Sequence, residues 1–129
     1  MGHDPSDPPL PLPLEVVVED HGRHHVVLLR GEVDMASVGD VRTCLRELML
    51  AGHTDVLIDL RGVTFMDSTG LGILVAARKQ ARVFRGSLGL VAPSPPVARV
   101  LSLTSLDRVF PCFATLDDAL APQGEPSAS

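Results

Sequence analysis

Two consecutive hydroxyl side chains, Ser68 and Thr69, lie in the segment Asp67-Ser68-Thr69-Gly70, and a serine can act as a nucleophile or receive a phosphate. A hydrolase elbow has glycine two residues before and two residues after its serine, but this chain has Met66 in the first position. A triad also needs a histidine, and His53 is expected at the far end of the preceding strand. We therefore expect no enzyme activity at Ser68.

The elements around this segment are expected to hold Ser68 between a strand and a helix. The apolar run from Val56 to Leu60 is continuous rather than alternating, which predicts a strand buried on both faces. A short polar and small segment, residues 61–66, should connect this strand to Asp67. Asp67 and Ser68 are typical helix-start residues because their side-chain oxygens accept free N–H groups of the first turn. We therefore expect Ser68 on a loop at the carboxyl end of a central strand, where open α/β sheets meet their ligands and partners.

The helix that follows Ser68 has two apolar faces with different predicted roles, and it should end at Arg85-Gly86. Leu71 and Val75 begin one face, which continues with arginines, and they either contact a partner or complete the core. The other face should pack on the sheet, since its small members allow a close approach; it comprises Gly70, Ile73, Leu74, Ala77, Ala81 and Phe84.

The rest of the chain predicts a single α/β domain. Ser37 should cap the first helix, and Ser94 should cap the third. The elements expected besides the central strand and its helix are strands at 14–20 and 25–30, a helix at 38–52, a strand at 87–91, a helix after Ser94, a short edge strand at 109–113 and a short helix at 115–121.

The two ends of the chain differ from the middle in composition. Residues 1–13 contain five prolines and are expected to form a disordered arm, because they cannot bury enough apolar surface to become ordered. Residues 14–121 should form the domain, and the polar residues 122–129 a flexible tail.

Composition excludes several classes of function. The formal net charge of −5 argues against a direct nucleic-acid partner, which would require a basic face. No apolar run approaches the roughly 18 residues of a membrane span, and the N-terminus lacks the pattern of a secretory signal. We therefore expect a cytoplasmic protein without a membrane partner.

Cysteine and histidine residues suggest no metal site or cofactor. Cys44 and Cys112 lack metal-ligand spacing, and we interpret both as small buried hydrophobic residues in a reducing cytoplasm. His21, His24 and His25 cluster in the sequence, but no cysteine or carboxylate completes a ligand set, so a polar hairpin tip is expected.

The stretch from Asp59 to Gly72 resembles the signature of the anti-sigma factor antagonists, which are single STAS domains of bacteria. An acidic residue at the expected end of a strand, a hydroxyl pair and a Gly-x-Gly follow one another in the family's order. The resemblance covers about residues 14–120, and it implies a STAS-like α/β domain with a mixed four- to five-stranded sheet and about four helices. The segment Gly31-Glu32-Val33-Asp34 is similar to the family's Gly-Glu-Leu-Asp. By this resemblance Asp34 lies close to Ser68, although its residue type also suits a loop or a helix cap.

This resemblance implies that Ser68 is phosphorylated by the partner, an anti-sigma factor that is itself a serine kinase. The unphosphorylated form would bind that partner and release a sigma factor. Phosphorylation would end the binding, and a phosphatase would restore it. The chain itself would hold no cofactor. Together with the apolar face of the helix, the candidate partner-binding residues are Asp34, Asp67, Ser68, Thr69, Gly70, Leu71, Gly72 and Val75.

An alternative remains within the same family. The chain is then a STAS subunit of another bacterial assembly, such as a stress-sensing complex or a lipid transporter. The intact Asp-Ser-Thr-Gly segment argues against lipid transport, and the lack of a long sensor domain argues against a complete sensor.

Overall fold

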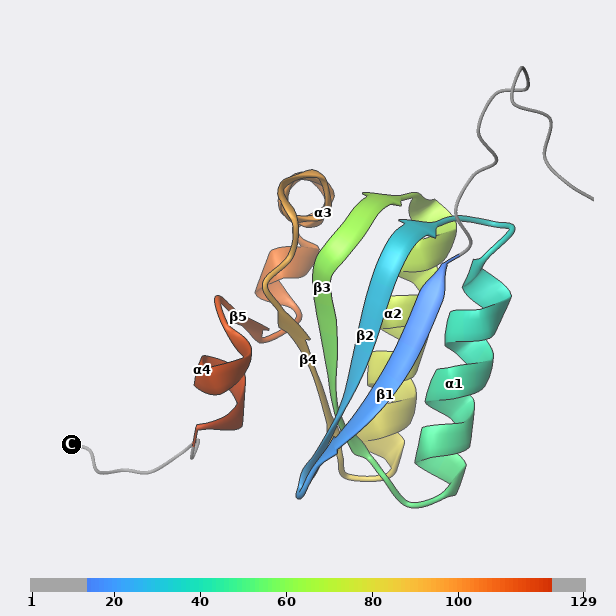
Figure 1. Cartoon of the computed structure of the whole chain (residues 1–129), viewed down its shortest axis with the longest axis vertical. Coiled ribbons are helices and arrows are strands. Elements are labelled where there is room, and N and C mark those ends of the chain that lie inside the picture. Colours follow the sequence, from blue (N-terminus) through green and yellow to red (C-terminus); the bar gives the residue numbers. More distant parts are fainter. Residues whose placement is uncertain (1–13, 122–129) are drawn as a thin grey trace, which may run out of the picture.

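A computed structural model describes residues 14–121, in which five strands form one mixed sheet (Figure 1). The predictions for residues 1–13 and 122–129 lie outside the described part. Strand β1 (Glu15–His21) pairs antiparallel with β2 (His24–Val33), and the remaining pairs are parallel. The order along the sheet is β1-β2-β3-β4-β5, with β3 (Asp55–Met66) in the centre, followed by β4 (Ser87–Val91) and β5 (Cys112–Phe113).

Four α-helices and one short 3-10 helix connect or follow these strands. Figure 1 shows α2 behind the strands and α1 next to it beyond β1, and each of these helices connects two parallel strands. The predicted α/β architecture, a mixed sheet of four to five strands with about four helices, is confirmed. The helices are α1 (Val38–Leu50), α2 (Ser68–Val83), α3 (Pro95–Leu103), the 3-10 helix (Leu106–Arg108) and α4 (Leu116–Leu120).

The central strand is buried on both faces, as its continuous apolar run predicts. Val56, Ile58 and Leu60 enter the main core beneath the helices, and Leu57 enters a smaller core beneath α4. Each of these four side chains is at most 3% exposed. This burial holds β3 rigidly in the middle of the domain and so fixes the position of the turn that follows it.

The segment 61–66 is not a connecting loop: β3 continues through it to Met66, so that prediction was wrong. Parallel pairing with β2 resumes at Arg30↔Gly62 after an irregularity and ends at Val33↔Met66. Val63 and Met66 are buried, while the residues between them are exposed, and this pattern keeps the extension attached to the core. As a result β2 and β3 end side by side.

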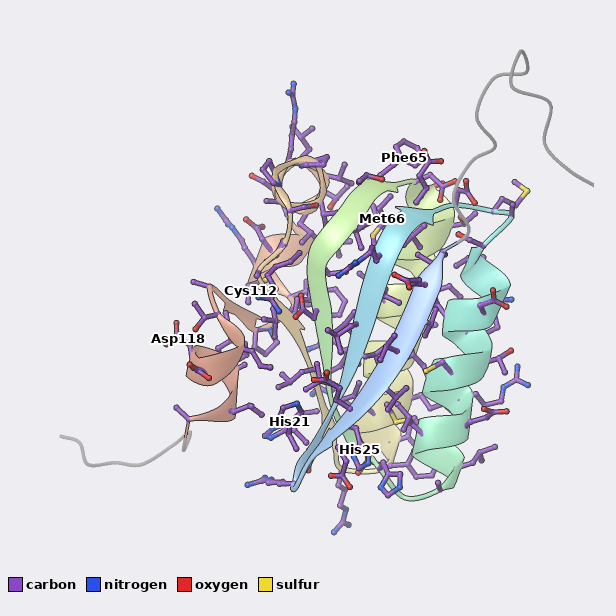
Figure 2. The ribbon with its side chains drawn as sticks, viewed as in Figure 1. His21, His25, Phe65, Met66, Cys112 and Asp118 are labelled. Carbon is purple, nitrogen blue, oxygen red and sulfur yellow. The ribbon has the colours of Figure 1, made fainter. Side chains whose placement is uncertain are left out.

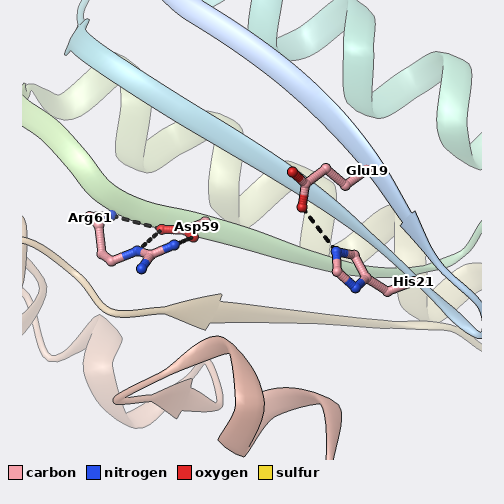
Figure 3. A network of polar contacts seen from close by, with 4 residues as sticks. All are labelled: Glu19, His21, Asp59 and Arg61. Carbon is pink, nitrogen blue, oxygen red and sulfur yellow. Dashed lines mark hydrogen bonds and ion pairs between the residues drawn. The ribbon is translucent and has the colours of Figure 1, made fainter.

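The face of the sheet opposite α1 and α2 carries ion pairs beside the small core that α4 covers (Figure 3). Asp59 is almost fully buried and accepts Arg61 Nη2 at 2.7 Å and Arg61 Nε at 3.2 Å. This pairing raises the pKa of the Arg61 guanidinium further above its ordinary value, chiefly through the hydrogen bond. The family resemblance suggested that Asp59 ends a strand. Instead Asp59 lies within β3, which continues to Met66.

Two further expectations about burial were wrong. Cys112 is exposed because it lies on the two-residue edge strand β5, and Cys44 is only half-buried on α1. Burial nevertheless raises the pKa of the Cys44 thiol. Phe84 follows the last turn of α2 and is 45% exposed, so the face of α2 that packs on the sheet ends at Ala81.

Candidate functional site

The candidate site forms where β2 and β3 end together. Because Val33 and Met66 are register partners, the next residues, Asp34 and Asp67, emerge from neighbouring strand ends. The Asp67 N–H also donates to the Val33 carbonyl oxygen at 3.2 Å, which joins the two ends directly. The structure therefore brings the segment 31–34 to the start of α2, as the resemblance implies.

Asp67 caps α2, and Ser68 is the first helical residue. The Asp67 Oδ1 atom accepts the backbone N–H of Thr69 at 2.9 Å and that of Gly70 at 3.2 Å. It also accepts the hydroxyl of Thr69. These donors, the Thr69 hydroxyl first, hold the pKa of the Asp67 carboxyl below its usual range, and the backbone N–H of Met35 adds to the effect.

The two neighbouring hydroxyls differ in environment. Ser68 is exposed on the first turn of α2, and its hydroxyl makes no hydrogen bond with any described residue. Thr69 is half-buried, and its hydroxyl is engaged with Asp67. The expectation that Ser68 stands on a loop was wrong, because Ser68 is already the first residue of α2. Of the two hydroxyls, only that of Ser68 is left free by the described residues.

The structure explains why glycine stands at position 70 but not why it stands at position 72. A Cβ atom on Gly70 would lie 2.7 Å from Met66 Cγ and 2.9 Å from Val33 Cγ1, so the helix can approach the two strand ends only with glycine there. A Cβ atom on Gly72 would meet nothing within 4 Å. Gly70 is therefore explained by packing, whereas this chain places no steric demand on Gly72.

Leu71 and Val75 are half-buried and pack against the main core. The interpretation that they complete the core thus has direct structural support. Their exposed parts leave the predicted contact with a partner open, and it stays a prediction.

Asp34 organises a tight turn before α1. Its Oδ1 atom accepts the N–H of Ala36 at 3.0 Å and that of Ser37 at 3.1 Å. The Ser37 hydroxyl donates to the Glu32 carbonyl at 2.8 Å and accepts the Asp34 N–H at 3.0 Å, so Ser37 does not cap α1 with its side chain. Ser37 therefore occupies the predicted N-cap position of α1, but its hydroxyl is used in the turn and does not bind a helix N–H. Ser94 likewise occupies the N-cap position of α3, but its hydroxyl donates to the Val63 carbonyl.

Sequence reasoning missed two apolar residues at the same edge of the domain. Met35 follows Asp34 and is 77% exposed. Phe65, near the end of β3, is 47% exposed and is labelled in Figure 2. Exposed apolar side chains next to a polar turn are a feature of protein interfaces. The signal was their position directly next to Asp34 and within the Phe-Met-Asp-Ser segment.

The one histidine considered as a base for Ser68, His53, lies far from it in the described structure. His53 precedes β3 and Ser68 follows it, so the twelve residues of that strand separate them by roughly 35 Å. His53 instead stacks on His25, with ring centroids 3.9 Å apart. Among the described residues no cluster of three His, Cys, Asp or Glu side chains is placed to hold a metal ion, and no helix has the length and apolar character to span a membrane.

The mixed sheet, the helix pair on one face and the capped turn at the carboxyl edge together define a STAS domain. The family model described as STAS domain matches residues 15–119. The chain belongs to this family, and its relatives are anti-sigma factor antagonists.

Three relatives illustrate this similarity. The anti-sigma-F factor antagonist RsfB of Mycobacterium tuberculosis is 33% identical over 107 residues, which cover 83% of this chain and 87% of RsfB. The crystal structure of an anti-sigma factor antagonist from Mycobacterium paratuberculosis superposes with a TM-score of 0.78 at 36% identity and covers 86% of this chain and 96% of that one. The phosphorylated form of the Bacillus cell fate determinant SpoIIAA superposes with a TM-score of 0.67 at 25% identity. The superposition covers 81% of this chain and 96% of SpoIIAA.

Proposed function

We propose that this protein binds an anti-sigma factor through the edge formed by Asp34, Met35 and the start of α2. The anti-sigma factor is a serine kinase, and its capture frees a sigma factor for transcription. The kinase transfers the γ-phosphoryl group of ATP to the hydroxyl oxygen of Ser68, which leaves ADP and releases the hydroxyl proton, and the phosphate ends the binding. A phosphatase removes the phosphate and restores the active form.

The free hydroxyl of Ser68 is the observation that carries this proposal. Phosphoryl transfer needs an oxygen that reaches a foreign active site, and Ser68 is exposed and unengaged within residues 14–121. Thr69 would have to leave both its half-buried place and its bond to Asp67. The proposal is supported by a relative, SpoIIAA, which has been solved in a phosphorylated form.

Electrostatics explains why a phosphate on Ser68 would act on the complex and not on the fold. At the start of α2 the phosphate faces free N–H groups, a favourable interaction of roughly 0.3–1 kcal/mol at an exposed site. The neighbouring carboxylate of Asp67 opposes it. In an interface, an unpaired buried charge costs about 2–5 kcal/mol, and 2 kcal/mol already lowers affinity about thirtyfold.

The test uses the full chain, the anti-sigma factor encoded by the source cell, and ATP. We expect mass spectrometry to locate one phosphate on Ser68, and we expect the phosphorylated protein to keep its thermal midpoint while its affinity falls about thirtyfold or more. The Ser68→Ala variant should still bind and should accept no phosphate. Phosphate on Thr69, or tight binding by the phosphorylated form, would contradict the proposal.

A further inference from the structure

The two helices behind the sheet carry an excess of positive charge in an acidic protein. The whole chain has a formal net charge of −5, yet α2 contains no acidic residue and α1 contains only Asp40 and Glu47. The cationic residues of the two helices are Arg42, Arg46, Arg78, Lys79 and Arg82. Negative charge is thus concentrated elsewhere on the molecule, and the helix layer is basic.

Within the described residues these cations form no ion pair, unlike three arginines on or beside the sheet. Arg23, Arg30 and Arg61 each form an ion pair with a carboxylate. Within residues 14–121, neither Arg42 nor Arg46 has an acidic partner, and both are exposed. They lie one turn apart on α1, a spacing at which like charges repel and destabilise a helix. The fold itself therefore gains nothing from this arrangement.

A groove runs between α1 and α2, and its volume is 210 Å³. Arg42, Arg46 and Gln80 line it with polar groups, while Leu45, Ile73 and Ala76 supply apolar surface. A site of this kind suits an apolar side chain flanked by carboxylates, because the apolar part fills the groove and the arginine forks bind the acids.

The groove shares helix α2 with the candidate site. Ile73 and Ala76 lie between one and a little over two turns beyond Ser68 on the same helix. A protein bound at Ser68 can therefore reach the groove without a long connecting segment.

We propose that the groove between α1 and α2 binds an acidic amphipathic segment of the same anti-sigma factor. This inference rests on the proposed function and adds a second contact region to it. A protein segment fits better than nucleic acid, since the described groove has no aromatic side chain on which bases could stack. It also fits better than a membrane, because the apolar groups line a groove and do not project from the surface.

The experiment measures association of the full chain with the anti-sigma factor by surface plasmon resonance at two salt concentrations. The test variant carries Arg42→Glu and Arg46→Glu. The matched control carries Arg99→Glu and Arg108→Glu, which change charge equally at exposed positions outside α1 and α2. We expect the test variant to lose about tenfold or more in affinity, mainly through slower association, and to lose most of its salt dependence. In the control variant, the affinity and its dependence on salt should each change by less than about threefold.

A neutral variant with Arg42→Gln and Arg46→Gln guards against a folding defect, and it should give an intermediate loss with native circular dichroism. If the wild type binds the anti-sigma factor but the test and control variants lose affinity equally, the groove assignment is overturned and the proposed function is not. If the wild type binds no anti-sigma factor, the proposed function fails first. A short DNA duplex and vesicles containing anionic lipid serve as further probes. Binding of either, abolished by the Arg→Glu pair, would also overturn the inference.

Discussion

The Asp67 carboxylate accepts the hydroxyl of Thr69, and this bond turns the hydroxyl of Thr69 inward while the neighbouring Ser68 stays free. The same oxygen accepts two backbone N–H groups at the start of α2. One carboxylate thus caps the helix and also gives the two adjacent hydroxyls different roles. Thr69 supports the cap, and Ser68 is left for another molecule.

Thr69→Val should therefore lower stability without moving the phosphorylation site. The change removes one hydrogen bond to a charged group, worth about 1.5–3 kcal/mol at most, and the half-buried position accepts a methyl group. Chemical denaturation measures the loss, and mass spectrometry after reaction with the kinase should still find phosphate on Ser68. A variant that takes no phosphate at all, while folded, would show that Thr69 contributes directly to phosphoryl transfer.

Gly70→Ala and Gly72→Ala should shift stability in opposite directions. The methyl group on Gly70 collides with Met66 and Val33, and overpacking of this kind costs about 1–3 kcal/mol. The methyl group on Gly72 meets only open space, and alanine in a helix is favoured over glycine by up to about 1 kcal/mol. Thermal unfolding of the two variants checks this.

Partner binding provides the second measurement on the same pair. If the anti-sigma factor approaches α2 closely at Gly72, a larger Gly72→Gln side chain should weaken binding while the domain remains at least as stable as the wild type. Unchanged affinity would remove Gly72 from the candidate contact residues.

The stability of the domain should depend on the charge of Asp67 in a defined direction. Its hydrogen bonds lower the pKa of the folded-state carboxyl below that of the unfolded chain, so ionised Asp67 stabilises the fold above the ordinary carboxyl range of about 4. This contribution is lost as the pH falls through the lowered pKa. Urea unfolding of the wild type and of Asp67→Asn should differ near neutral pH and converge in acid. A difference that is independent of pH would refute this assignment.

Asp34→Asn separates the two roles of Asp34. The amide oxygen can still accept the N–H groups of Ala36 and Ser37, so the turn and the thermal midpoint should be nearly unchanged. Loss of the charge beside the start of α2 should alter the phosphorylation rate or the partner affinity severalfold. Asp34→Ala is the comparison, since it removes the acceptor as well and should also lower stability by about 1 kcal/mol. If Asp34→Asn equals the wild type in phosphorylation rate and partner affinity, the only role of Asp34 is to stabilise the turn.

Local signals predicted the elements that depend on local physics. The buried run from Val56 to Leu60 and the helix start at Asp67 were clear, because continuous hydrophobicity and helix caps involve neighbours in sequence. The extension of β3 to Met66 was missed because it depends on pairing with β2 through irregular register. Such pairing joins residues about thirty positions apart, and no short window of sequence contains it.

The candidate site was found through family resemblance, but its internal differences were not. Nothing in the order Ser68-Thr69 indicates that one hydroxyl is engaged and the other free, since that depends on the rotamer of Asp67. Met35 and Phe65 were missed because apolar residues beside strand ends usually belong to the core. In the structure Val33 and Met66 fill the core at the strand ends, and Met35 and Phe65 are therefore left exposed.

Strand β1 is an edge of the described sheet, and it carries Val16, Val17 and Val18 in a row. Such an edge invites the addition of a strand from another copy, the first step toward insoluble fibres. Antiparallel addition centred on Val17 would place Glu15 of each copy against Glu19 of the other, and like charges directly opposite destabilise a sheet. The acidic residues that flank the three valines of β1 should therefore keep the protein in solution at high concentration, and neutralising Glu15 and Glu19 should promote aggregation before it affects the fold.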